Sequence, residues 1–467
     1  MAKRPLSRES KEATALLSIG TFLEYFDLML FVHMAVVLND FFFPKDDPFI
    51  TPLLTAFAFC STYVFRPIGA LLFGWIGDNI GRKSTIVITT TMMAISCIAM
   101  ANMPTYAEIG VTAAILVTVC RIVQGMTSMG ERIGAEIYLT ESPLHRFRFP
   151  VVALIAAFST VGGTAALGFA HGLMKYKFDW RIAFWIGGFV AIIGLISRLR
   201  LPESMEFVNF KKLQKRVLEE QFASPARINE VLDAPIFKQR ASWWTRGAFF
   251  CIQCAHPLCF YFIYGYCVTI LKDKFHCTPA EIIHNNFIVS LFELAKMLII
   301  VPFLSYYIYP LRILGVKLAL FSIGILVGPY FLSTATSAND VFIIQAICSL
   351  IALGSGPALP IFYSHLPVAE RSTSASLIYA IARAFMYIIT TFSCGYVVNK
   401  FGYNGLLILF IPVFTGYLLG LIHFTKLEKK SLIYPNSWFN LHILYPQNDD
   451  DDDDDDDDDQ AKEKSSL

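Results

Sequence analysis

Ionisable side chains lie inside long apolar stretches of this chain, where each of them carries a high energetic cost. Ten such residues occur: Glu24, Asp27, Arg66, Arg121, Glu131, Arg132, Glu136, Glu293, Lys296 and Arg383. A charge near the middle of a bilayer costs about 3 kcal/mol or more, and it usually faces a partner or a water-filled cavity. Snorkelling to a helix end could explain one of these residues, but not ten. The pattern predicts a polar pathway through a membrane protein.

Two pairs of these residues are spaced three apart, which places both members on one face of a helix. Glu24 and Asp27 form the first pair, and close like charges raise the pKa of one partner, as a proton carrier requires. The alternative is that each acid pairs with a basic residue such as Arg66. Glu293 and Lys296 have opposite charges, which favours an internal ion pair over a substrate site.

The remaining charges suggest how a small solute could be held. Arg121 and Arg132 lie on one helical stripe, and Arg383 has no acidic neighbour in its segment, so it is expected to face the cavity. An arginine can hold a carboxylate by two parallel hydrogen bonds. An aromatic face, for which Tyr264 is a candidate, can hold a cationic nitrogen.

Composition indicates how these residues are positioned. Hydrophobic residues make up 55% of the 467 residues and charged residues 16%, against about 25% charged in soluble domains. About 20 apolar residues span a bilayer, and twelve such runs occur: 14–38, 51–76, 85–102, 107–139, 149–173, 180–199, 244–271, 282–304, 311–332, 338–360, 373–397 and 403–424. We therefore predict an all-α membrane protein with twelve transmembrane helices in two six-helix bundles.

The predicted domains are an N-terminal bundle (1–199), a cytoplasmic linker (200–243), a C-terminal bundle (244–424) and a tail (425–467). Lysine and arginine concentrate on the side that holds the linker, which predicts that both termini are cytoplasmic. The apolar run after the basic start is expected to be a retained first helix, not a cleaved signal. The tail contains an unbroken run of aspartates, Asp449–Asp459, and a block of like charges is expected to be disordered.

The stretch "GWIGDNIGRKST", residues 74–85, lies between the second and third runs. It does not fit a phosphate-binding loop, because Arg82 stands where that motif requires its second glycine. The sequence offers no nucleophile–base constellation and no zinc-ligand spacing. We therefore expect no enzyme activity, cofactor, metal or nucleic-acid partner. A small-molecule substrate, a coupling proton or sodium ion, and the lipid bilayer are the expected partners.

The same stretch resembles the loop signature of the major facilitator superfamily, G-x-x-x-D-x-x-G-R-[RK]. The matching residues are Gly74, Asp78, Gly81, Arg82 and Lys83. The resemblance implies that the loop aspartate meets the start of the eleventh helix, at Ser372-Thr373-Ser374, and that the basic pair meets Glu141. Such contacts would latch the two bundles in the outward-open state.

Three longer segments are similar to the metabolite:proton symporter family: "GTFLEYFDLMLFVHMAVVLNDFFFP", "FRPIGALLFGWIGDNIGRK" and "RIVQGMTSMGERIGAEIYLTE". This resemblance implies a symporter of the bacterial inner (plasma) membrane. The aromatic segment "CFYFIYGYCV" favours the proline/betaine branch, and a dicarboxylate such as α-ketoglutarate is the alternative substrate. The chain departs from the family pattern at Thr21, Tyr25, Met129 and Arg132, and the second-half repeat of the loop signature is largely lost. That loss leaves a non-transporting membrane sensor as a further alternative.

Overall fold

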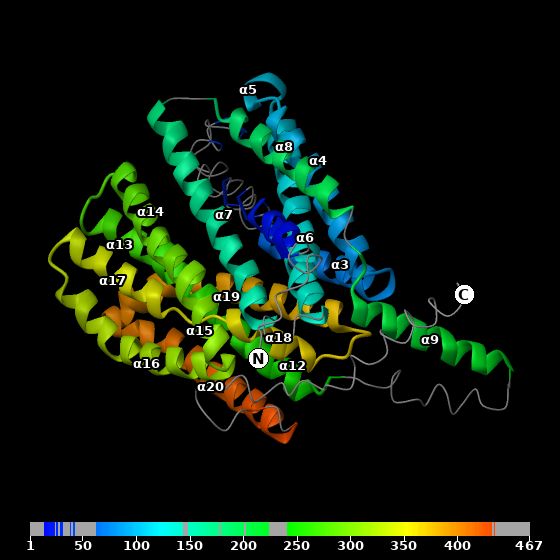
Figure 1. The fold of residues 1–467 in the computed structure, drawn as a ribbon. Coiled ribbons are helices and arrows are strands. Elements are labelled where there is room, and N and C mark those ends of the chain that lie inside the picture. The colour runs from blue at the N-terminus through cyan, green and yellow to red at the C-terminus, as the bar shows by residue number, and fades with distance from the viewer. Residues whose placement is uncertain are drawn as a thin grey trace, which may run out of the picture.

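A computed structural model gives the arrangement of the chain (Figure 1). It describes residues 14–23, 25, 26, 29, 30, 38, 41, 42, 62–142, 148–176, 179–199, 202–223, 241–431 and 434. Regular structure within these ranges is entirely helical. Glu24 and Asp27, the proposed proton carriers, lie outside the described residues.

The helices before the linker come from the predicted second to sixth runs. Their bounds are α3 (Arg66–Asn79), α4 (Arg82–Ala101), α5 (Tyr106–Ile109), α6 (Val111–Glu141), α7 (Arg148–Tyr176) and α8 (Arg181–Arg198). Helix α4 packs against both α6 and α8, and α3 packs against α6. The short α5 has a capping box, in which Thr105 and Glu108 satisfy each other's free backbone N–H groups.

The predicted linker contains a helix of its own, α9 (Met205–Ala223). The helices that follow are α12 (Trp243–Tyr261), η3 (Phe262–Tyr266), α13 (Cys267–Asp273), α14 (Pro279–Ala295), η4 (Lys296–Ile300), α15 (Val301–Tyr307), α16 (Pro310–Thr334), α17 (Ala338–Ile351), η5 (Gly356–Ala358), α18 (Leu359–Ser364), α19 (Arg371–Phe401), η6 (Gly402–Gly405) and α20 (Leu406–Lys430). Helix α12 packs against α19 and α20.

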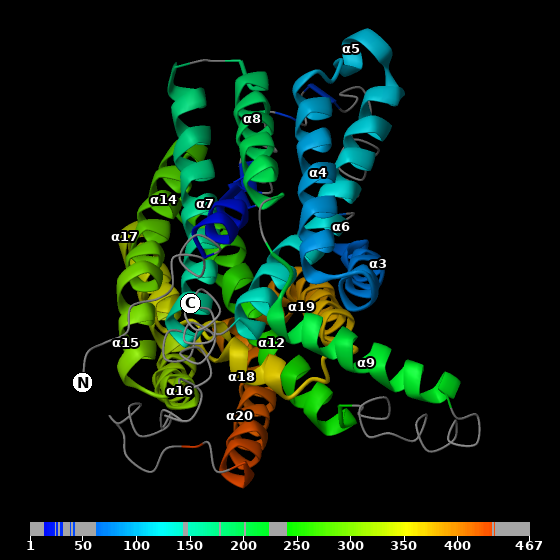
Figure 2. The ribbon, with the colours of Figure 1, turned by 45° about the vertical axis from the view of Figure 1, so that its right-hand side comes forward.

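Two of the contacts between elements before α9 and elements after it position the site, and α6 also packs against α18 and α19. Helix α3 packs along α19, and α7 packs against α14 and α15, as both views of the ribbon show (Figures 1 and 2). The first contact brings the "GWIGDNIGRKST" stretch to the start of α19. Because the two contacts lie on different helices, they frame a space between them that the functional site occupies.

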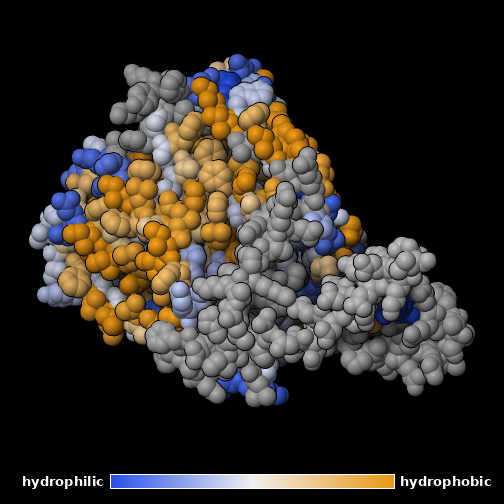
Figure 3. Space-filling view, in the orientation of Figure 1, coloured by the Kyte–Doolittle hydropathy of each residue, from blue (hydrophilic) through white to orange (hydrophobic). Residues whose placement is uncertain are grey.

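Eight segments of the described chain are long and apolar enough to cross a membrane. Large apolar side chains point outward from them, including Leu326 (76% exposed) and Ile299 (68%). Figure 3 shows a broad apolar surface over α14, α15 and α16, with polar residues near its edges. Such a surface suits lipid, and the chain is a multi-pass membrane protein.

The structure departs from the expected boundaries in two places. Helix α20 continues to Lys430, although the tail was predicted to begin at 425, because Glu428 is buried there against Tyr309 and His365. Two π-helical turns, η3 and η4, interrupt helices that the sequence pattern treats as continuous. Turns of this kind are frequent at functional sites, and both contribute residues to the cavities described below.

Candidate functional site: an ion network and a central cavity

Asp78 joins the end of α3 to the start of α19. Its Oδ1 accepts the backbone N–H of Ser372 at 2.9 Å, and its Oδ2 accepts the N–H (2.8 Å) and hydroxyl (2.7 Å) of Thr373. The first N–H groups of a helix lack intrahelical partners and carry partial positive charge. Burial raises the pKa of the Asp78 carboxyl above its usual range, whereas Arg82 and the hydrogen bonds from Thr373 and Ser372 oppose that rise.

The glycines of the motif allow this close approach. A Cβ atom on Gly74 would lie 2.6 Å from the Cα of Thr373, and one on Gly77 would lie 2.5 Å from the Ser372 hydroxyl oxygen. Gly81 has φ +145°, a conformation that side chains other than glycine rarely adopt. The loop signature is therefore a packing requirement as well as a set of charges.

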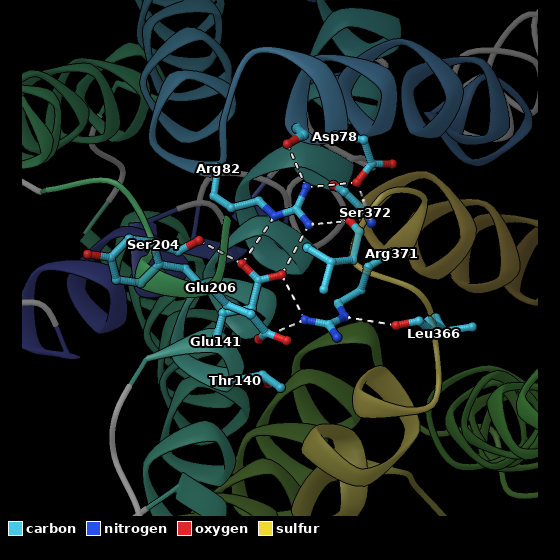
Figure 4. A network of polar contacts seen from close by, with 12 residues as sticks. Asp78, Arg82, Thr140, Glu141, Ser204, Glu206, Leu366, Arg371 and Ser372 are labelled. Atoms are coloured by element: carbon cyan, nitrogen blue, oxygen red, sulfur yellow. Dashed lines mark hydrogen bonds and ion pairs between the residues drawn. The ribbon is translucent and has the colours of Figure 1, made fainter. Parts of the chain in front are cut away.

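Arg82 is the centre of a buried ion network at this end of the molecule, shown in Figure 4. Its Nη1 donates to Asp78 Oδ1 at 2.7 Å, and its Nη2 donates to Glu141 Oε1 at 3.0 Å. Only 1% of the Arg82 side chain is exposed, and none of the Glu141 side chain. The fixed fork of a guanidinium suits two such partners.

Three residues that were not singled out in the sequence complete this network. Arg371, the first residue of α19, donates from Nη1 to Glu141 Oε1 and to Glu206 Oε2, both at 2.9 Å. The hydroxyl of Ser204 donates to Glu141 Oε2 at 2.7 Å. We call Asp78, Arg82, Glu141, Arg371 and Glu206 the latch network. It ties α3, α4 and α6 to α19 and to the linker helix α9.

Lys83 differs from the expectation that both basic residues of the motif meet Glu141. Its backbone N–H donates to Glu203 Oε1 at 3.1 Å, and of the two basic motif residues it is Arg82 that bonds to Glu141. Successive residues of a helix point about 100° apart, so two neighbours at the start of α4 cannot both face α6.

A central cavity of about 1220 Å³, part of it open to solvent, lies between the elements before and after the linker. Its polar lining comes from both groups of elements: Tyr25, Tyr63, Arg66, Arg132, Glu136, Gln253, His256, Tyr264, Glu293, Tyr379, Arg383 and Tyr387. The predicted site residues Arg66, Arg132, Tyr264 and Arg383 therefore meet in one space, although they are far apart in the sequence.

Two of the cavity arginines have no acidic partner among the residues that the structure describes. Arg66 lies 4.7 Å above the ring of Tyr63, and Arg383 lies 4.2 Å above the ring of Tyr379. Within the described part of the chain, neither guanidinium forms an ion pair, and the buried Nε of each lacks a hydrogen-bond partner. Buried donors without partners are expensive, so both groups are available to a ligand carboxylate.

Arg132 lines the central cavity from α6. It pairs with Glu136 at 3.1 Å and contacts the Tyr25 hydroxyl. The other oxygen of Glu136 accepts the hydroxyl of Tyr363, from α18, at 2.6 Å. These contacts again join elements before and after the linker, so they form a second closure beneath the latch network.

A row of neighbouring aromatic rings in the cavity lining leads from Arg66 to Glu293. Tyr63 and Tyr387 have centroids 4.9 Å apart, Tyr387 and Phe260 6.4 Å, and Phe260 and Tyr264 5.0 Å. The Tyr264 hydroxyl then donates to Glu293 Oε2 at 3.2 Å. We call these four rings the aromatic strip.

Two predicted site residues lie elsewhere. Glu131 faces away from the cavity and pairs with Arg198 of α8 at 2.5 Å, with both side chains almost fully buried. Arg121 is also buried, and its Nη1 donates to Gln124 at 2.8 Å. Neither lines the central cavity. The sequence did not predict the Glu131–Arg198 pair, because a basic residue in the last turn of an apolar helix does not indicate its partner.

The predicted ion pair between Glu293 and Lys296 is not formed in this structure. Glu293 accepts the Tyr264 hydroxyl, and the Lys296 ammonium reaches across to the backbone carbonyl of Ser349 in α17. The backbone from Glu293 to Lys296 is regular α-helix, in which the Lys296 N–H donates to the Phe292 carbonyl, and the π turn η4 follows it. The pair is therefore absent because each side chain has another partner.

The described chain is thus an all-helical membrane fold with a central polar cavity, closed at one end by contacts between distant helices. The family model "Major Facilitator Superfamily" matches residues 17–391, and the chain belongs to this family. A solved neighbour is the proton:xylose symporter XylE, with a TM-score of 0.67 and 15% identity over 90% of this chain and 95% of that one. At that identity the likeness shows the fold alone.

Curated relatives match part of the chain. The Escherichia coli inner membrane metabolite transport protein YhjE is 34% identical over 46% of this chain and 50% of its own length. A putative proline/betaine transporter of Staphylococcus aureus is 31% identical over 44% of this chain and 45% of its own. The proline/betaine transporter of Salmonella typhimurium is 31% identical over 42% of this chain and 41% of its own. The matches thus span about half of these relatives or less.

Proposed function

We propose that this protein is a secondary active transporter that works by alternating access. In this proposal two six-helix bundles, 1–199 and 244–424, rock against each other across the central cavity. Residues 200–243 form the linker. The protein lies in the inner membrane of a bacterial cell, and both of its termini lie in the cytoplasm. The cavity lining supports it, because residues from both predicted bundles surround one polar space.

The latch network supports a specific working state. It closes the end of the cavity at which α3, α4 and α19 meet, and the positive-inside pattern assigns that end to the cytoplasm. The structure then corresponds to a state closed toward the cytoplasm. Inward opening must break the Asp78 contacts to α19 and separate Arg371 from Glu141.

The substrate that fits the cavity best is a small zwitterion such as proline or betaine, taken up with protons. The unpaired guanidiniums of Arg66 and Arg383 carry this assignment, because either can receive a carboxylate by two hydrogen bonds. The aromatic strip lies beside them and offers ring faces to a cationic nitrogen. Three of the similar proteins named above are metabolite or proline/betaine carriers by name.

A dicarboxylate such as α-ketoglutarate is the second candidate, and the pair of unpaired arginines favours it. One carboxylate could bind at Arg66 and the other at Arg383. The non-transporting sensor has less support, because the Asp78 and Arg82 contacts needed for a latch are present despite the lost second loop signature.

Uptake into proteoliposomes tests the proposal. Purified protein is reconstituted, and accumulation of labelled proline, betaine and α-ketoglutarate is compared with and without an imposed inward proton gradient. We expect gradient-driven accumulation of one zwitterion. Accumulation of α-ketoglutarate alone would select the second candidate. If no solute accumulates in either condition while the protein is folded and inserted, the transporter proposal is wrong.

A further inference from the structure

A side chamber of about 540 Å³, including space open to solvent, opens from the central cavity. The two spaces share Glu293, Tyr264, His256 and Phe260. The chamber extends between α12, η4 and α16, and its deeper polar groups are Lys296 and Lys317. Most of the remaining lining is apolar, including alanine, leucine, isoleucine and valine side chains.

The charges of this chamber do not balance. Lys296 is 4% exposed, and its ammonium donates only to the Ser349 carbonyl. Lys317 is half-buried, and it has no hydrogen bond or ion pair with any residue in the part of the chain that the structure describes. Glu293 is the one described carboxylate in the lining, and it accepts the Tyr264 hydroxyl. Two ammonium groups therefore face one carboxylate.

This excess positive charge needs an explanation. Lys296 and Lys317 line the same chamber, and burying a cation in apolar surroundings is unfavourable unless it is paired. Snorkelling does not supply a partner for Lys296, because its ammonium already points inward to Ser349 of α17. Lys317 lies seven residues after the start of α16, roughly 10 Å along the helix axis.

We propose that the side chamber is an anion subsite that binds a small anionic group between Lys296 and Lys317. The anion is either a free halide ion or a second carboxylate of the transported solute. Both sources have the same chemistry, a compact negative charge that accepts charge-assisted hydrogen bonds from two ammonium groups. The carboxylate source rests on the proposed transport function, whereas the halide source does not.

Binding to the purified full-length protein in lipid nanodiscs tests the subsite without requiring transport. Thermal unfolding is measured while sodium chloride replaces a bulky sulfonate salt at constant ionic strength. Separate titrations use α-ketoglutarate and betaine. The variants are Lys317→Gln, which removes one cation, and Glu293→Gln, which removes the opposing charge and keeps an oxygen for the Tyr264 hydroxyl.

We expect Lys317→Gln to weaken anion binding by about tenfold or more, the loss of one charge-assisted hydrogen bond. Glu293→Gln is expected to bind the same anion more tightly than wild type. A chloride response with this pattern identifies a free-anion site. The same pattern with α-ketoglutarate and not with chloride identifies a substrate carboxylate.

The proposal fails if wild type responds to neither anion, or if both variants bind as wild type does. Should Lys317→Gln not fold, Lys296→Gln and Glu293→Gln give opposite expected shifts and decide the question. Failure here leaves the uptake experiment unaffected, because gradient-driven accumulation of a zwitterion does not depend on chloride or on this chamber binding an anion.

Discussion

Replacing Asp78 by asparagine tests the latch network by changing one oxygen atom to an amide nitrogen. The carboxylate accepts four hydrogen bonds, from Arg82, Ser372 and twice from Thr373, two at each oxygen. An asparagine keeps one oxygen, and its NH₂ group then faces two donors whichever way it is turned. Two accepted bonds are lost, each worth about 1.5–3 kcal/mol for a charged group.

The lower end of that range is appropriate, because the Thr373 hydroxyl can rotate to accept from the amide. The closed state is then destabilised by about 3 kcal/mol relative to the open state, which shifts the equilibrium by a factor of roughly 100. A transporter must populate both states in each cycle. We therefore expect Asp78→Asn to lower the initial uptake rate at least tenfold, although the protein reaches the membrane in normal amount.

The assay is initial uptake of the accumulated solute, normalised to the protein in the membrane. Asn79→Ala is the matched control, because Asn79 is the exposed neighbouring residue and its side chain bonds only its own helix, at the Trp75 carbonyl. The control should transport within about twofold of wild type, as surface substitutions usually do. Near-normal uptake by Asp78→Asn would refute the latch role.

Three further substitutions test other parts of the structure. Arg198→Gln leaves the Glu131 carboxylate buried and unpaired, so it should lower the free energy of unfolding by about 3–5 kcal/mol. In thermal unfolding, the Glu131→Gln/Arg198→Gln double variant should melt at a higher temperature than Arg198→Gln. Equal melting temperatures of the two variants would contradict the pairing. Arg383→Lys should weaken the apparent uptake affinity about tenfold, because an ammonium cannot replace the two parallel hydrogen bonds of a guanidinium; unchanged affinity would exclude Arg383 from the carboxylate site. Gly74→Ala should reduce both uptake and melting temperature, since its Cβ would lie 2.6 Å from Thr373 Cα, whereas Gly328→Ala, with no atom within 4 Å, should change neither.

The sequence predicted those features that depend on local spacing. The loop motif predicted that Asp78 would meet the start of α19, and the structure places it there because a carboxylate is the natural partner of free helix N–H groups. The apolar runs predicted an all-helical membrane fold, because about 20 apolar residues are needed to cross a bilayer, and eight described segments are long and apolar enough to do so. Glu206 was missed because nothing in a polar linker indicates which of its charges will be buried, and Arg371 was missed because a basic residue at the start of α19 does not reveal its distant partner, Glu141.

The direction in which a side chain points from its helix explains why Glu131 is not at its predicted position in the cavity. Glu131 and Arg132 were grouped as cavity candidates, but adjacent residues of a helix point about 100° apart. Arg132 consequently faces the cavity, while Glu131 faces α8 and pairs with Arg198. Glu293 and Lys296 share a helical face as predicted, but each takes another partner, the Tyr264 hydroxyl for Glu293 and the Ser349 carbonyl for Lys296.

The two closures that join distant helices have a consequence for the permeability of the membrane. Glu141 belongs to the latch network, and Glu136 belongs to the second closure beneath it. The two residues lie five apart on α6, roughly 7 Å along its axis. A passive leak of ions would need both barriers to open at the same moment, and for independent openings that probability is the product of two small numbers. Weakening one barrier alone should therefore slow the cycle while the membrane stays electrically tight.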